Sequence, residues 1–262
     1  MTLLHHVIKG QGEPPIVFVH GFACSHRDWD AQVAHLSPRH RTVAVDLRGH
    51  GSSAGTAADC SIERYGADIA ELLRALALPP SVLVGHSLGC RVVIEAALQA
   101  PSHTAGLVLV DGSQFSPSMP AMLAEQFAKE DGYRTLTGAL FASMFTERSE
   151  KDVVASVVDR ARRLPREVGE KMLPDLARYD VHRLAGSLGC LRVPVMAIQA
   201  TYTNERRERA SLRAGQSTPY LDLLRANVPG VRVEIVPDCG HFPQLDQSAR
   251  TNAFIEKFAG AL

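Results

Sequence analysis

Short, mostly apolar runs recur along the chain between more polar stretches. Six of them are five or six residues long and rich in branched side chains: 16–20, 42–46, 81–85, 106–110, 194–198 and 231–236. A brief run without apolar–polar alternation is typical of a strand that is buried on both faces of a parallel sheet. The pattern therefore predicts six strands of one mostly parallel sheet.

Between these runs the apolar residues change to helical spacing. Trp29, Val33 and Leu36 share one face of a helix, and the segment from Ile62 to Leu76 repeats the pattern. A further helix is expected from about Asp246 to the end of the chain. Strands that alternate with helices indicate an α/β fold, in which a mostly parallel sheet is flanked by helices.

One segment breaks this alternation after the predicted strand 106–110. Residues 115–188 contain helical patterns and several prolines but no strand-like run. Roughly seventy residues without structure would be unusual inside a compact domain, so the segment is expected to form an inserted helical cap. The predicted organisation is a core of residues 1–114 and 189–262 with a cap of residues 115–188.

A Gly-x-Ser-x-Gly sequence, Gly85 to Gly89, lies directly between the predicted strand 81–85 and a helical pattern. The two glycines permit a tight strand-to-helix turn that exposes the hydroxyl of the central residue, Ser87. The motif is common by chance, but here both flanking elements are the required ones. Ser87 is therefore the predicted nucleophile.

Three other motifs accompany this turn, and with it they resemble the α/β-hydrolase fold superfamily over essentially the whole chain. His20-Gly-Phe22 is similar to the oxyanion loop of that family, Asp46 to Ser52 to its D-x-R-G-x-G-x-S turn, and Asp238 to Phe242 to its histidine loop. The resemblance implies that His241 is the general base and that the backbone N–H groups of Phe22 and Leu88 form the oxyanion hole. It also implies that no cofactor and no metal is needed.

The acid of the expected Ser–His–acid triad is missing from its usual place. After the strand 194–198 the chain has Thr201 to Asn204, and the first acid is Glu205. Asp111 ends the neighbouring strand 106–110, and in this superfamily the acid can also sit there. Because the carboxyl ends of neighbouring parallel strands meet at one edge of the sheet, Asp111 is preferred over Glu205. The alternative for Asp111 is an Asp-Gly turn that merely closes a strand.

These residues predict a serine hydrolase that cleaves a small, mainly apolar ester or lactone through an acyl-enzyme on Ser87. The side chains expected to line the substrate pocket are Phe22, Phe115, Met144 and Phe242. Two other readings stay open. One is a cofactor-free dioxygenase with a His241–Asp111 base, and the other is a small-molecule receptor of the same fold.

The composition of the chain limits the kinds of binding partner that are expected. The 262 residues include 28 Lys and Arg and 28 Asp and Glu, so the formal net charge is zero. Without a global charge, nucleic acid and anionic membranes are not expected partners, and a small-molecule substrate is. The five cysteines are scattered and follow neither a zinc spacing nor a disulfide framework, which favours a reducing cytoplasm.

Overall fold

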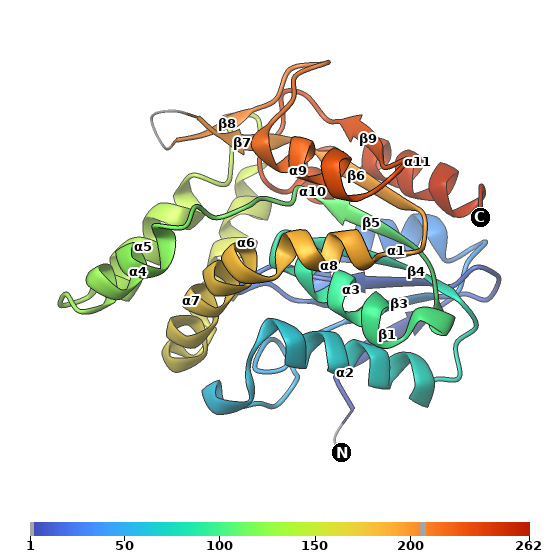
Figure 1. Cartoon of the computed structure of the whole chain (residues 1–262), viewed down its shortest axis with the longest axis horizontal. Helices are drawn as coiled ribbons and strands as arrows, with labels where there is room; N and C mark the ends of the chain where they lie inside the picture. The colour runs from blue at the N-terminus through green and yellow to red at the C-terminus, as the bar shows by residue number, and fades with distance from the viewer. Residues whose placement is uncertain (1–2, 205–207) are drawn as a thin grey trace.

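The computed structural model describes residues 3–204 and 208–262, and a seven-stranded sheet runs through its centre (Figure 1). The strands in their order across the sheet are β1 (His6–Lys9), β3 (Thr42–Val45), β2 (Ile16–Val19), β4 (Ser81–His86), β5 (Thr104–Val110), β6 (Val195–Gln199) and β9 (Arg232–Ile235). All neighbours pair in parallel except β1, which is antiparallel to β3.

Both faces of the central part of this sheet are buried, because alternate residues of β2 to β6 enter two separate apolar cores. In β2, Val17 and Val19 belong to one core, and Ile16 and Phe18 belong to the other. The second core also contains Trp29 and residues of the last helix. Continuous apolar runs in the sequence follow directly from this two-sided burial.

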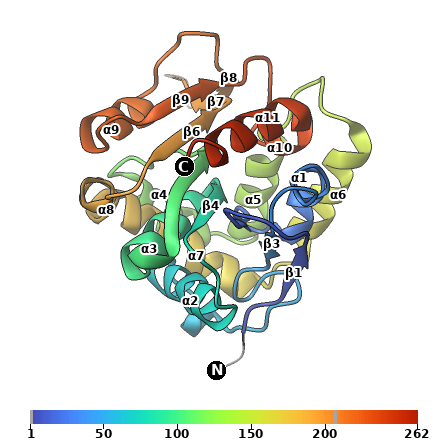
Figure 2. The ribbon, with the colours of Figure 1, turned by 90° about the vertical axis from the view of Figure 1, so that its right-hand side faces the viewer.

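Helices cover the two faces (Figure 2). On one side lie α1 (Asp30–Leu36) and α11 (Ser248–Ala259), preceded by the short α10 (Pro243–Asp246). On the other side lie α2 (Ile62–Ala75), α3 (Leu88–Gln99), α8 (Leu184–Cys190) and α9 (Pro219–Asn227). Among the helices that the structure describes, none is both long enough and apolar enough to cross a lipid bilayer.

The segment between β5 and β6 is helical throughout its regular elements. It contains α4 (Met119–Phe127), α5 (Gly132–Ala142), α6 (Lys151–Arg162) and α7 (Arg166–His182), which gather at one end of the sheet (Figure 1). The guanidinium of Arg160 on α6 contacts the buried Asp28 carboxylate of the core. The boundaries of a cap at 115–188, against a core of 1–114 and 189–262, stay a prediction, and α8 extends across the second boundary.

The α/β fold and its mostly parallel sheet are confirmed, and each of the six predicted strands corresponds to an observed strand. Three strands escaped the sequence analysis: β1 and the antiparallel pair β7 (Thr201–Thr203) and β8 (Arg209–Ser211). All three are three or four residues long and only partly buried. A short strand at a sheet edge or in an exposed hairpin needs no apolar run, so the pattern contained no signal for it.

Candidate active site

Ser87 occupies a strained turn between β4 and α3. Its φ of 53° and ψ of −113° are unusual for a residue with a side chain. The flanking glycines make the turn possible by permitting close backbone contacts. A Cβ at Gly85 would lie 2.3 Å from the carbonyl oxygen of Gly89, and a Cβ at Gly89 would lie 2.5 Å from that of Val19. The predicted strand–turn–helix context of Ser87 is therefore present.

Ser87, His241 and Asp111 form one hydrogen-bonded chain. The Ser87 hydroxyl donates to His241 Nε2 over 2.9 Å, and His241 Nδ1 donates to Asp111 Oδ2 over 2.6 Å. Ser87 is half-buried, whereas His241 and Asp111 are almost completely buried. The structure thus brings together the three side chains that the sequence analysis predicted as nucleophile, base and acid.

Asp111 reaches His241 from the end of β5, where it adopts a left-handed φ of 43°. Aspartate tolerates this region better than most residues. Its Oδ1 accepts the backbone N–H groups of Ala200 and Thr201, each over 2.8 Å, and its Oδ2 also accepts the Thr201 hydroxyl over 2.6 Å. Four donors including His241 thus converge on the Asp111 carboxylate. The rival acid, Glu205, lies outside the described residues.

Burial dominates the electrostatics of this pair. It lowers the pKa of the His241 imidazole well below its ordinary value, with further lowering by the charges of Arg209 and Arg91. Burial raises the pKa of the Asp111 carboxyl, and Arg209 together with the hydrogen bonds from Thr201 and Ala200 opposes that rise. Neutral imidazole is the form that can accept a proton from a serine, so the site holds His241 in the protonation state of a general base.

A buried ion pair between Arg91 and Asp180, which the sequence analysis missed, supports the turn that carries Ser87. Arg91 on α3 donates to the backbone carbonyl of Ser87 over 2.9 Å, and its guanidinium binds both oxygens of Asp180 on α7 over 2.9 and 2.7 Å. Both side chains are at most 1% exposed. Asp180 Oδ2 also accepts the backbone N–H of Phe115 over 2.8 Å. The inserted helices are thereby coupled to the turn that carries Ser87.

The two residues predicted to form the oxyanion hole lie beside this turn. Leu88 is the first residue of α3, so its backbone N–H has no acceptor within the helix. Phe22 follows Gly21, where an added Cβ would lie only 3.2 Å from the Ser87 Cβ. His20 holds this loop in place by donating to the Gly21 carbonyl over 2.7 Å and accepting the Leu47 N–H over 3.0 Å. The role of both N–H groups stays a prediction.

Three of the four predicted pocket residues are almost fully buried: Phe22, Met144 and Phe242 are 5%, 5% and 1% exposed, while Phe115 is half-buried. The backbone carbonyl of Met144 accepts the backbone N–H of His241 over 2.7 Å. Phe242 packs against the His86 and His241 rings, with centroids 4.8 and 5.6 Å away. Met144 and Phe242 therefore help to hold the histidine loop, whatever their part in substrate binding.

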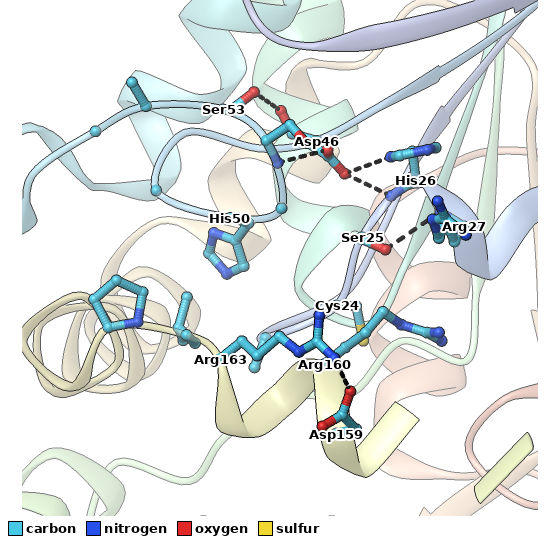
Figure 3. Close-up of a pocket in the computed structure, with 18 of the residues that line it drawn as sticks. Cys24, Ser25, His26, Arg27, Asp46, His50, Ser53, Asp159, Arg160 and Arg163 are labelled. Carbon is cyan, nitrogen blue, oxygen red and sulfur yellow. Dashed lines mark hydrogen bonds and ion pairs between the residues drawn. The ribbon is translucent and has the colours of Figure 1, made fainter. Parts of the chain in front are cut away.

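A polar cavity of about 650 Å³ lies between the loop after β2, the turn after β3 and helix α6 (Figure 3). Its lining includes Cys24, which follows the predicted oxyanion loop by two residues, and the arginines Arg160 and Arg163.

At the edge of this cavity the Asp46 carboxylate accepts Nδ1–H of His26 over 2.9 Å and that of His5 over 3.0 Å. In the described part of the chain these three side chains are the one group with metal-ligand types close enough to share an ion.

Comparison with known proteins decides the family. A model described as the alpha/beta hydrolase family matches residues 16–254, which is most of the chain. The chain belongs to the alpha/beta hydrolase family. This match covers all four motifs of the sequence analysis and confirms the predicted fold.

The relatives of this hydrolase-family chain differ in name and length. It is 25% identical to the dihydrolipoyllysine-residue acetyltransferase component of the acetoin cleaving system from Cupriavidus necator, over 96% of this chain but only 65% of that protein. It is 30% identical to the pimeloyl-acyl-carrier-protein methyl ester esterase of Nitrosomonas europaea, over 94% of this chain and 95% of the relative.

Solved structures agree with the fold. The enol-lactonase from Burkholderia xenovorans LB400 superimposes with a TM-score of 0.79, covering 97% of this chain and 95% of the lactonase at 22% identity. At this identity the likeness concerns the fold alone. The esterase relative at 30% identity and the family match support the prediction of an esterase-like hydrolase.

Proposed function

We propose that the chain is a serine hydrolase that cleaves a small ester or lactone through an acyl-enzyme on Ser87. The observation that carries the proposal is the continuous hydrogen-bonded chain from Ser87 through His241 to Asp111, with distances of 2.9 and 2.6 Å. A serine hydroxyl is a weak nucleophile unless an adjacent base removes its proton. The neutral, buried imidazole at hydrogen-bonding distance supports this role for His241.

The mechanism follows from these positions. Ser87 Oγ attacks the substrate carbonyl carbon while its proton passes to His241 Nε2, and Asp111 stabilises the imidazolium that forms. The carbonyl oxygen becomes an oxyanion facing the N–H groups of Phe22 and Leu88, and each such donor contributes about 10²–10³ in rate in comparable enzymes. His241 then gives the proton to the leaving oxygen.

The second half of the reaction repeats these steps with water. His241 removes a proton from a water molecule, the hydroxide attacks the acyl carbon, and Ser87 leaves with the proton returned by the imidazole. For a lactone the alcohol and acid products remain one molecule.

A mainly apolar substrate is supported by the aromatic and thioether side chains near the site. Phe22, Met144 and Phe242 are buried next to the oxyanion loop or the histidine loop, and Phe115 is half-buried at the start of the inserted segment. The names of the similar proteins include an ester and an enol-lactone as substrates.

The five free cysteines are consistent with the proposed cytoplasmic location.

Labelling with a fluorophosphonate probe tests the nucleophile. We expect one label per chain, lost in Ser87→Ala. The matched control is Ser187→Ala, because Ser187 begins a second Ser-Leu-Gly-Cys tetrapeptide but donates its hydroxyl to the buried Glu95 over 3.1 Å. This control should label like the wild type. Failure of the wild type to label would favour a dioxygenase with a His241–Asp111 base, or a receptor.

A panel of p-nitrophenyl esters tests the substrate class. We expect the highest kcat/KM for short acyl chains without charge, since the predicted pocket residues Phe22, Met144, Phe242 and Phe115 are apolar. A preference for long-chain or strongly charged acyl groups would contradict the proposed apolar, small pocket without affecting the assignment of Ser87.

A further inference from the structure

Arg209 is a cation placed against the triad, and the hydrolytic mechanism above does not require it. Its Nη1 lies 2.8 Å from Thr201 Oγ1, 3.1 Å from His241 Nδ1 and 3.9 Å from Asp111 Oδ2. The side chain is only 16% exposed. A guanidinium so close to a catalytic imidazole must affect the protonation of that imidazole.

The β7–β8 hairpin holds Arg209 in this position. Arg209 begins β8 and pairs with Thr203 on β7. The hairpin is fixed at its base, where the Leu212 N–H donates to the Ala200 carbonyl over 2.8 Å. Its Ser211 hydroxyl donates to the Cys239 carbonyl in the histidine loop over 2.6 Å. The hairpin therefore connects the carboxyl end of β6 to the loop that carries the base.

The geometry at His241 Nδ1 excludes a useful hydrogen bond from Arg209 to the imidazole. Nδ1 donates its proton to Asp111 over 2.6 Å, so it has no lone pair left for Arg209. Arg209 Nη1 instead donates to Thr201 Oγ1, whose own proton goes to Asp111 Oδ2 over 2.6 Å. When His241 gains a second proton, two cations face each other across 3.1 Å.

The other ionisable groups around His241 contribute less charge. Arg91, which is paired with the buried Asp180, lowers the pKa of His241 less than Arg209 does. His86 packs against the His241 ring at 4.8 Å and stays neutral, because burial lowers its pKa to about 3. Burial also raises the pKa of the Cys239 thiol, so this group stays neutral as well. Among the described neighbours, Arg209 is therefore the charge that, after burial itself, lowers the pKa of His241 most.

We propose that Arg209 is a positioning residue of the triad, which orients the Asp111 carboxylate through Thr201 and opposes protonation of His241. The consequence is a general base that remains available at acidic pH. The same positive charge also makes the His241 imidazolium that forms during the reaction less stable. The kinetic part of this inference rests on the proposed function, but the protonation of His241 can be measured without any substrate.

The primary test is an NMR titration of the His241 ring in the wild type and in two variants. Arg209→Gln retains a donor for Thr201 without the charge, and Arg209→Lys retains the charge without the planar fork. At an effective dielectric constant near 20, a unit charge about 5 Å away changes a pKa by about two. We expect the pKa of His241 to rise by about one to two in Arg209→Gln and to stay near the wild-type value in Arg209→Lys.

The matched control is Arg213→Gln, because Arg213 lies four residues further along the same segment and is exposed. It should leave the His241 titration unchanged. An Arg209→Gln protein that folds, as checked by circular dichroism, and titrates like the wild type would overturn the inference. If that variant does not fold, a higher pKa of His241 in Arg209→Lys than in the wild type would overturn it equally.

The kinetic test follows the acid limb of the pH profile of kcat/KM, which reports the base of the free enzyme. In Arg209→Gln the limb should move to higher pH by the same amount as the NMR titration, while Arg209→Lys restores it. A purely structural role would lower kcat/KM equally at every pH and leave the limb in place. Loss of fluorophosphonate labelling in the wild type, with the expected titration intact, would defeat the proposed hydrolase and leave the role of Arg209 standing.

Discussion

The exchange Asp111→Asn tests the triad most directly, because the contacts of this side chain predict how it fails. The amide oxygen of an asparagine can still accept the N–H groups of Ala200 and Thr201, which now bind Asp111 Oδ1. The amide nitrogen then replaces Oδ2, where it faces His241 Nδ1 at 2.6 Å. A donor at this place forces the imidazole to accept at Nδ1 and to carry its proton on Nε2.

The expected magnitude follows from this change of tautomer. A proton on Nε2 points at the Ser87 hydroxyl, so His241 can no longer act as its base. The same exchange in the triad of serine proteases lowers kcat by about 10⁴, which corresponds to about 5.4 kcal/mol of transition-state stabilisation at 1.36 kcal/mol per tenfold change. We expect a loss of kcat of about this size in Asp111→Asn, with the fold retained.

The assay is steady-state hydrolysis of a p-nitrophenyl ester, with circular dichroism and thermal unfolding as checks on the fold. Glu205→Gln is the control, since it removes the rival acid, and its kcat should stay within a few-fold of the wild type. The opposite pattern, a large loss in Glu205→Gln and a small one in Asp111→Asn, would refute the reasoning. Asp111 would then only close a strand.

Three further predictions concern stability. Asp180→Asn leaves the guanidinium of Arg91 buried without a counter-charge, so the free energy of unfolding measured in urea should fall by about 3–5 kcal/mol. A loss below about 1 kcal/mol would mean that the ion pair is not needed for stability. Gly89→Ala puts a methyl group 2.5 Å from a backbone carbonyl oxygen and should destabilise the fold by about 1–3 kcal/mol or more. The control Gly186→Ala should not destabilise the fold, because the space around the new carbon is open. Equal thermal stability of the two variants would contradict this prediction. Burial lowers the pKa of His50 to about 4 and of His86 to about 3, so below about pH 6.5 the unfolded chain binds protons that the folded chain does not. The free energy of unfolding should therefore fall by about 1.4 kcal/mol per pH unit for each of these histidines between pH 6.5 and pH 4, and urea titrations that give equal values at pH 7 and pH 5 would exclude it.

Local sequence determined most of the core fold. Five of the six apolar runs became strands β2 to β6, which bury both faces, and burial on both faces requires apolar residues at consecutive positions. The turn around Ser87 was equally local, since Gly85 and Gly89 are needed by backbone contacts within the motif and with the neighbouring strand. Short, partly buried strands such as β1 have no such requirement, and they were not foreseen.

The prediction of the candidate site depended on the prediction of which strands are neighbours in the sheet. Ser87 and His241 are part of recognisable motifs, and the choice of Asp111 depended on the end of β5 lying beside the end of β6, as it does. The distances of 2.9 and 2.6 Å that unite the three side chains could not be read from the sequence. Their catalytic roles, and that of Glu205, remain predictions for the mutants above.

Only the tertiary structure decided which charges surround the site. Arg209 contacts a histidine 32 positions away, and Arg91 pairs with an aspartate 89 positions away. In the sequence Arg209 is one of several arginines in a polar stretch, and Arg91 is one polar residue within an apolar helix. An ion pair between distant elements has no period and no motif, because only the folded path of the backbone brings its two members together. The sequence thus determined the sheet and the motifs that carry Ser87 and His241, whereas folding alone determined the electrostatic setting in which these side chains lie.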